Sequence, residues 1–381
     1  FKIFDKKNAE KLFGKNLNIS ASQLEKFNLC RFSYFCNYGL NVRERQRAEI
    51  NPMQYGTIVH YILERFFGEY TKEEYLSLEE DKFQKIVCAY LAEYAVKYFG
   101  EEQLESNSFT YRLKTILDNV MYLMKHIMEE LSQSEFFVAD CELKIGEDIP
   151  SYTIVLPDGH KIAVCGSVDR VDIMPRADIT YLRIIDYKTG TKQFKLSDIL
   201  YGINLQMLLY LHSIEASGCD KYGEIVPAGI LYMPATVPYI SSDSLKSIDK
   251  LPDELNKKLK MNGLLLKDTE IIHGMDKTDA ATYIPVKIKA GEPVSSTSLA
   301  TLAEFGKIFK KVDMLIAEMG KNIYSGNIEA KPLKGGHDSC EYCPYDSVCA
   351  YRQSNPITCF SVDNKTVIEE ITNEINGKEE E

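Results

Sequence analysis

The chain has 381 residues, of which 45% are hydrophobic, enough for a large core in one elaborate domain or two to three smaller units. Its formal net charge of −11 argues against a generally basic nucleic-acid binder, so nucleic acid would have to meet local basic patches. No run of eighteen apolar residues occurs and residues 1–7 lack an apolar signal sequence. We therefore expect a cytoplasmic protein that makes no membrane contact.

The first third of the chain is predicted to be helical. Residues 20–38 begin with the serine and glutamine spacing of a capped helix, and residues 55–67 form a helix with an apolar stripe. His60 projects from the first turn of that second helix. Two longer amphipathic helices are predicted over residues 72–100 and 108–132.

After residue 135 the hydrophobic period changes to that of strands. The predicted strands cover residues 136–145, 152–156, 161–173, 181–187 and 224–233, with a helix over 196–216. The pattern from 235 to 297 is irregular, a long helix covers 298–324, and residues 361–381 hold seven acidic residues and two lysines.

The strand ending at Asp186-Tyr187-Lys188 contains the most informative residues. Side chains alternate along a strand, so Asp186 and Lys188 share one face at the end of an apolar run. Such a pair is usually a surface ion pair of little consequence. A second apolar run, seventeen residues upstream, ends in Asp169, and two carboxylates on neighbouring strands predict a site for a divalent cation.

Four pieces in this order resemble one family. They are Gly56 to His60 opening a helix, Gly166-Ser167-Val168-Asp169-Arg170-Val171-Asp172, Asp186-Tyr187-Lys188-Thr189-Gly190, and Gln206 with Tyr210 in a helix. Together they resemble the RecB-like branch of the PD-(D/E)xK nuclease superfamily. The resemblance implies an α/β fold with a restriction-endonuclease-like core, in which helices flank a mixed central sheet, together with a helical insertion.

The resemblance also implies roles for particular residues. His60, Asp169 and Asp186, with the backbone carbonyl of Tyr187, would hold one or two Mg²⁺ or Mn²⁺ ions. Lys188 would orient the attacking water or balance charge on the phosphate. Hydrolysis of a DNA phosphodiester is the implied reaction.

Three further residues are weaker candidates. Glu142 lies among apolar neighbours on the first strand, where it is either an exposed edge acid or an acid near the metal site. Gln206 and Tyr210 lie four apart on one helix face, where they either pack normally or touch DNA and support Lys188. Arg170 and Asp172 are interpreted as structural support.

Cys340, Cys343 and Cys349 lie within ten residues and can bind one centre, with Cys30 as a fourth ligand if the fold brings both ends together. Spacing alone leaves zinc and a [4Fe-4S] cluster as alternatives. One early cysteine and a late Cys-x2-Cys-x5-Cys resemble the iron-sulfur nuclease module of the B subunit of AddAB-type helicase-nucleases. That resemblance implies a [4Fe-4S] cluster that staples the N-terminal and C-terminal regions.

The resemblance further implies DNA as substrate, and two protein partners: an AddA-like motor, which is the helicase-nuclease A subunit, and the rest of the B subunit. The chain starts at Phe1 and lacks the helicase-like N-terminal region of that family, as a fragment of a longer protein would.

The expected division is 1–54, an N-terminal segment with the first cluster cysteine; 55–134, a helical part with His60; 135–234, the core sheet and the Gln-x-x-x-Tyr helix; 235–297, an insertion; 298–360, a helix and the cysteine cluster; and 361–381, an acidic tail.

The expected function is therefore that of a DNA exonuclease in double-strand break end processing and recombinational repair. One alternative is a non-catalytic DNA-binding or docking module of such a complex. Another is a stand-alone CRISPR-associated RecB-like exonuclease, although the long helices and residues 235–297 make the chain large for that class.

Overall fold

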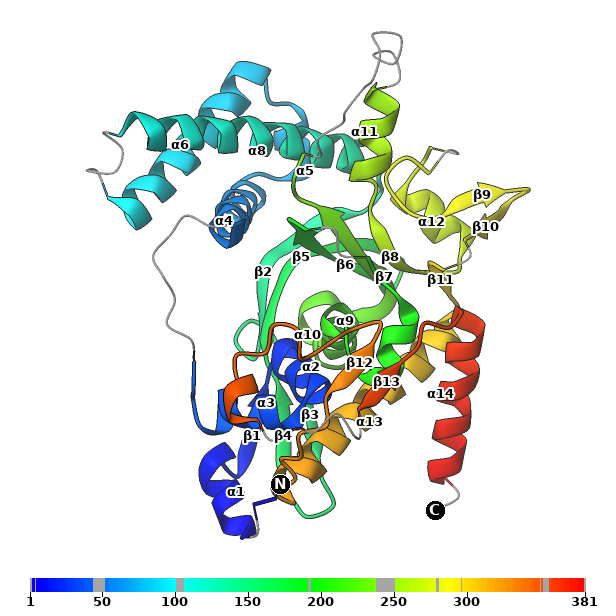
Figure 1. Ribbon diagram of the computed structural model, residues 1–381. Coiled ribbons are helices and arrows are strands. Elements are labelled where there is room, and N and C mark those ends of the chain that lie inside the picture. The colour runs from blue at the N-terminus through cyan, green and yellow to red at the C-terminus, as the bar shows by residue number, and fades with distance from the viewer. Residues whose placement is uncertain are drawn as a thin grey trace.

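The computed structural model describes residues 2–3, 5–43, 52–100, 106–190, 193–237, 251–278, 281–295, 297–349, 351 and 356–379. At its centre lies a mixed sheet of six strands, with helices packed on both sides (Figure 1). This arrangement confirms the predicted α/β class with a mixed central sheet flanked by helices.

The sheet has the spatial order β11-β8-β7-β6-β5-β2. Neighbours pair antiparallel from β2 to β6, whereas β6 and β7 run parallel. The strands are β2 (Phe137–Ile145), β5 (Gly166–Arg176), β6 (Ile179–Lys188), β7 (Glu224–Pro234), β8 (Asn262–Leu266) and β11 (Leu299–Ala300). β6 lies between two partners and is buried over most of its length, as its continuous apolar run predicts.

Four helices lie on one side of the sheet, close to β2 (Figure 1). They are α4 (Pro52–Glu69), α5 (Lys72–Leu76), α6 (Glu80–Phe99) and α8 (Asn107–Gln133). The long helices predicted over 72–100 and 108–132 are therefore present, with α5 as a separate short helix at the start of the first.

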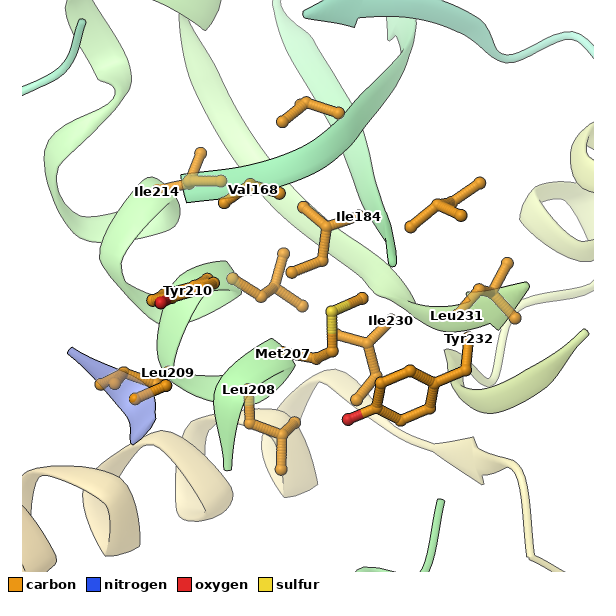
Figure 2. Packing of buried hydrophobic residues seen from close by; sticks show 14 of the residues in the cluster. Val168, Ile184, Met207, Leu208, Leu209, Tyr210, Ile214, Ile230, Leu231 and Tyr232 are labelled. Carbon is orange, nitrogen blue, oxygen red and sulfur yellow. The ribbon is translucent and has the colours of Figure 1, made fainter. Parts of the chain in front are cut away.

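The other side of the sheet is covered by α9 (Gln206–Ser217), which packs between the strands and α13 (Leu302–Tyr324). Every residue from Met207 to Ile214 is buried, because this helix is apolar around most of its circumference and must be covered all round. Figure 2 shows its side chains beside Ile184 of β6. α9 therefore fixes the sheet from beneath.

The N-terminal segment builds a smaller unit beside this core. It contains α1 (Lys6–Phe13), α2 (Ala21–Leu29), α3 (Arg31–Tyr34), a π-helical turn over Phe35–Gly39, and a small sheet of order β1-β4-β3, formed by Asn16–Ile19, Lys161–Val164 and Thr153–Val155. The helix predicted over 20–38 is thus broken, because Cys30 adopts an extended backbone between α2 and α3.

Two other predicted elements are also divided. The strand expected over 161–173 splits at Cys165, whose N–H donates to the Ile19 carbonyl, so β4 joins the small sheet and β5 the main one. The helix expected over 196–216 becomes a 3₁₀ helix (Leu196–Tyr201) followed by α9. Gly202 separates them at φ +71°, where a Cβ would meet the Asn28 side chain at 2.2 Å.

The stretch predicted to be irregular supplies β8 to the main sheet, and β11 follows it. It also contains α11 (Leu251–Leu259), α12 (Thr269–Met275), β9 (Lys287–Lys289) and β10 (Glu292–Val294), while residues 238–250, 279–280 and 296 of that stretch lie outside the described ranges. The core sheet thus extends beyond residue 234.

The acidic C-terminal segment forms α14 (Asn364–Glu379), which packs on α13. Val367 and Ile371 are fully buried, and the buried Lys311 of α13 pairs with Glu374 at 2.5 Å. The described part of this segment therefore belongs to the folded core.

Within the described ranges, no helix has both the length and the apolar character that spanning a membrane requires.

Candidate active site

Three strands bring acidic residues together at one place in the sheet. The ladder between β5 and β6 ends at Arg170 opposite Ile185, and the next residues are Asp169 and Asp186. On the other side of β5, Arg170 lies opposite Cys141, so Glu142 is the neighbour of Asp169 on β2. The Tyr187 N–H donates to the Asp169 carboxylate at 2.9 Å, which holds that side chain between the strands.

His60 reaches this place from α4. Its Nδ1 lies 3.0 Å from Glu142 Oε1 and its Nε2 lies 3.6 Å from Asp169 Oδ2. One potential ligand atom each from His60, Glu142 and Asp169 lies within 4.8 Å of the other two, close enough to hold one metal ion. We call His60, Glu142, Asp169, Asp186 and Lys188 the acidic site.

Glu142 occupies an unusual backbone position. The register between β2 and β5 shifts between Val138 and Asp140, and Glu142 itself has φ +50°. A left-handed conformation of this kind in a side chain other than glycine costs about 1–3 kcal/mol and is concentrated at functional sites. One Glu142 carboxylate oxygen lies 3.0 Å from His60 Nδ1, while the Ser167 hydroxyl donates to the other at 2.7 Å.

The acidic site accumulates negative charge. Burial and the nearby Asp186 carboxylate raise the pKa of Asp169 to about 7, although His60 and the Tyr187 N–H oppose the change. Burial lowers the pKa of His60, but the Glu142 hydrogen bond and the three carboxylates outweigh it and raise that pKa to about 9. In the absence of a cation, protons balance much of this charge.

Lys188 lies at the edge of the acidic site. Its ammonium is 2.5 Å from Asp186 Oδ2 and 5.8 Å from the centre of the Tyr232 ring. Tyr232 stands opposite Asp186 in the parallel ladder between β6 and β7 and is buried. Sequence reasoning missed both Tyr232 and Ser167, because only strand pairing places them here.

The helix candidates lie beneath the strands. Tyr210 is buried, and a Cβ built on Gly166 would lie 2.2 Å from its hydroxyl, so the glycine that opens β5 leaves the space that Tyr210 fills. Burial raises the pKa of Tyr210 to about 12, and the Asp169 and Asp186 charges add to the effect. Gln206 is the first residue of α9 and half-buried, with no hydrogen bond to the acidic site among described residues.

Arg170 and Asp172 belong to a second charged cluster behind the strands. Glu130 of α8 and Asp172 each pair with both Arg170 and Arg183, at 2.6–3.2 Å, and all four side chains are fully buried. Arg170 also donates to the Tyr187 hydroxyl at 3.2 Å. We call these four residues the buried ion network; it links α8 to β5 and β6.

The four predicted cluster cysteines meet at one cavity. Cys30, Cys340, Cys343 and Cys349 line a space of about 230 Å³, and none of them forms a disulfide. Among described residues, no three of these sulfur atoms lie within 4.8 Å of one another. Burial raises the pKa of Cys30, while backbone hydrogen bonds from Ser33 and Phe32 oppose the change.

One contact joins the two ends of the chain beside the cluster cysteines, and one strand pair orders the C-terminal side. The Tyr345 hydroxyl donates to the Val42 carbonyl at 2.7 Å. β12 (Leu333–Gly335) pairs in parallel with β13 (Ile357–Cys359) on the C-terminal side. Residues more than 300 positions apart in sequence are thus neighbours.

Comparison of the sequence with known proteins matches this chain to a family of nucleases. The family model for the PD-(D/E)XK nuclease superfamily matches residues 18–350. The B subunit of an ATP-dependent helicase/deoxyribonuclease from Clostridium kluyveri (strain NBRC 12016) is 35% identical over 397 residues, covering 100% of this chain and 34% of that protein. The corresponding B subunit from Thermoanaerobacter sp. (strain X514) is 34% identical, over 90% of this chain and 30% of that protein. The chain thus spans about a third of the length of these curated relatives.

Proposed function

Because the chain belongs to the PD-(D/E)XK nuclease superfamily, we propose that it is a metal-dependent DNA exonuclease. It acts in the cytoplasm as the nuclease module of a helicase-nuclease complex that processes double-strand breaks for recombinational repair. The names of the related subunits support DNA as the substrate. The observation that carries the proposal is the convergence of His60, Glu142 and Asp169 beside the Asp186 and Lys188 pair.

The donor set of the acidic site fits a hard divalent cation. Carboxylate oxygens with one imidazole are suitable ligands for Mg²⁺ or Mn²⁺. His60, Glu142 and Asp169 would hold the ion, with Asp186 and the Tyr187 carbonyl completing its ligands. When bound, the ion supplies charge that polarises the phosphate and lowers the pKa of the attacking water.

The remaining side chains have supporting roles in this proposal. Lys188, held by Asp186, orients the water or balances charge that develops on the phosphate. Ser167 fixes the second oxygen of Glu142, and the Tyr187 N–H fixes Asp169, so both carboxylates face the site before substrate arrives. Tyr210 and Gln206 lie on the helix below and support the strands or touch DNA.

Cleavage of DNA labelled at one end tests this function. The purified chain is incubated with single-stranded and double-stranded DNA in Mg²⁺, with EDTA as the control. Metal-dependent release of short products from one end is the expected result, and the labelled end that is lost gives the polarity. Absence of cleavage in both Mg²⁺ and Mn²⁺ would leave the alternative of a non-catalytic docking module.

We further propose that the cysteine cavity holds a [4Fe-4S] cluster. Cys30, Cys340, Cys343 and Cys349 line one cavity of about 230 Å³ and could supply the four thiolates that such a cluster needs. The resemblance of one early cysteine and a late Cys-x2-Cys-x5-Cys to an iron-sulfur nuclease module favours this cluster over the zinc alternative.

Visible absorption and iron analysis of the anaerobically purified chain test this assignment. A brown chromophore with iron in excess of zinc is expected. Cys343→Ser should lose the chromophore and destabilise the chain, because the cross-link between distant segments is worth roughly 5 kcal/mol. Cys219→Ser, at an exposed thiol outside the cavity, is the control and should change neither. A colourless chain that contains zinc would contradict the cluster.

The relatives' names suggest the partners. We propose that the chain works as part of a longer protein of the B type, in a complex with an AddA-like motor. Co-purification of this chain, within its full-length protein, with such a motor tests the partnership.

A further inference from the structure

A cluster of aromatic rings with one lysine lies beside the acidic site, on the surface that α4 and α6 form. The Tyr61 ring, one residue after His60, is 5.2 Å from the Tyr94 ring, and Tyr94 is 4.4 Å from Tyr98, between ring centroids. The Lys97 ammonium lies 5.2 Å from the Tyr98 ring centre and 6.0 Å from that of Tyr61. We call Tyr61, Tyr94, Lys97 and Tyr98 the Tyr-Lys platform.

The platform is rigid at its base and open at its surface. Tyr94 is buried and packs against Phe99, whereas Tyr98 is 56% exposed although its side chain is large and mostly apolar. The Tyr61 hydroxyl is tied to Glu93 at 2.8 Å. An exposed ring is thus supported from below by rings that cannot easily move.

The positive charge of the Lys97 ammonium is available to contact an anionic ligand. Its ammonium forms no ion pair in the part of the chain that the structure describes, whereas the neighbouring Arg65 is paired with Glu69 at 2.7 Å. A flat aromatic face beside an unpaired cation is the combination that surfaces for single-stranded nucleic acid use, because every base has a face to stack and every linkage has a phosphate.

The platform and the acidic site share one surface. Glu64 lies one turn beyond His60 on α4. Its pKa is raised by burial and by the charge of Glu142 and lowered by the charges of Lys144, Arg65 and Lys97. Because His60 and Tyr61 are consecutive residues of α4, the platform begins next to the acidic site, and we expect one bound strand to contact both.

We propose that the Tyr-Lys platform binds single-stranded nucleic acid next to the scissile phosphodiester, with Tyr98 stacking on a base and Lys97 contacting a phosphate. This inference rests on the proposed nuclease function and deepens it, because it names the surface that would hold the strand beside the site of cleavage. A duplex keeps its base faces covered, so the platform selects a strand that is already separated. Stacking is tolerant of sequence, as a processing nuclease requires.

Binding measured without cleavage tests the platform separately from catalysis. The anisotropy of a labelled twelve-nucleotide oligothymidine is followed as the purified chain is added in EDTA. Tyr98→Ala should weaken binding about tenfold, because the loss of one stacked base has an effect of that order. Tyr98→Phe keeps the ring and should bind as the unchanged chain does. Tyr111→Ala, on α8 at a tyrosine that is 73% exposed, is the matched control and should have no effect.

The salt dependence of the same titration isolates Lys97. Lys97→Gln should reduce the slope of log affinity against log salt concentration by about 0.7, the value for one phosphate contact on a single strand. Lys85→Gln, at an exposed lysine elsewhere on α6, should leave the slope unchanged.

Each outcome decides the proposal. If Tyr98→Ala and Lys97→Gln bind as the unchanged chain does, or if Tyr111→Ala weakens binding equally, the platform is not a nucleic-acid site, and the exposed ring is left for contact with a protein. These measurements need no metal, so they are distinct from failure of the nuclease function, which shows as absence of cleavage in Mg²⁺ while the chain still binds the oligonucleotide.

Discussion

The acidic site and the buried ion network meet at consecutive residues of β5, Asp169 and Arg170, and their charges are balanced in different ways. In the buried ion network, Glu130 and Asp172 are neutralised by Arg170 and Arg183, whose guanidinium groups remain charged at any ordinary pH. In the acidic site, one residue away at Asp169, the balance depends on protons, because the pKa values of Asp169 and His60 are raised. Fixed charges suit a structural role, whereas protons can be displaced by an incoming cation.

The largest expected effect is on cleavage. Asp186→Ala should reduce the cleavage rate by at least about a hundredfold, because the loss of one charged group that stabilises a transition state costs that much or more. Thermal stability should not fall, since Asp186 raises the pKa of its neighbour Asp169 by repulsion. Cleavage of end-labelled DNA measures the rate, and thermal melts measure the stability. Asp178→Ala, at an exposed acid in the β5-β6 turn, is the control; if Asp186→Ala still cleaves DNA, the acidic site is not catalytic.

The buried ion network should show the opposite pattern. Arg183→Met removes one guanidinium and leaves Glu130 and Asp172 to share the other, which should lower the free energy of unfolding by about 3–5 kcal/mol. Cleavage per folded molecule should be retained. Arg176→Met, on the same sheet but in an exposed pair with Glu135, should cost about 0–1 kcal/mol in urea unfolding. If both variants lost the same free energy of unfolding, the buried ion network would stabilise the chain no more than an exposed ion pair does.

The protons of the acidic site predict how the metal-free chain responds to pH. Asp169 titrates near 3.8 when unfolded and near 7 when folded, so the folded chain holds a proton that the unfolded chain has lost. Stability should therefore fall as pH rises from about 4 to 7, and His60 should extend the fall from about 6.5 to 9. Urea unfolding in EDTA at pH 5 and 7 should show a smaller fall for Asp169→Asn. If the free energy of unfolding fell by the same amount between pH 5 and 7 in both proteins, Asp169 would be ionised in the folded chain at both pH values.

The smallest expected effect concerns a residue that touches only a proposed ligand. Ser167→Ala removes the hydrogen bond to Glu142 and should weaken Mn²⁺ affinity about tenfold, which is typical when a ligand loses its supporting contact. The metal concentration for half-maximal cleavage measures this change. Ser132→Ala, at a hydroxyl that donates to the Glu129 carbonyl within α8, should leave it unaltered.

Sequence reasoning was most successful where a short motif and a local pattern agreed. The mixed sheet was predicted, and the structure places His60, Asp169, Asp186 and Lys188 in one region, as the motifs suggested. Glu142, the weaker candidate, lies closer to His60 than Asp169 does, at 3.0 Å against 3.6 Å, and it has a left-handed backbone at φ +50°. No local sequence pattern predicts the left-handed conformation of Glu142.

The remaining differences arise from pairing between distant segments. The break at Cys165 occurs because β4 pairs with β1, almost 150 residues earlier, and β8 enters the sheet from a stretch without regular periodicity. Ser167 and Tyr232 reach the acidic site only through the register of the ladders. Periodicity describes each strand by itself, and these contacts depend on which strands meet.

The meeting of Cys30 with the segment from Cys340 to Cys349 has a mechanical consequence. Every strand of the main sheet lies between these two points of the chain, so their contact closes a ring of polypeptide around the sheet. We expect tension on segments outside this ring to load first the junction where the Tyr345 hydroxyl donates to the Val42 carbonyl, beside the cluster cysteines. The strands that carry Glu142, Asp169 and Asp186 all lie inside this closed segment, so we expect the acidic site to keep its shape when the segments outside it are pulled.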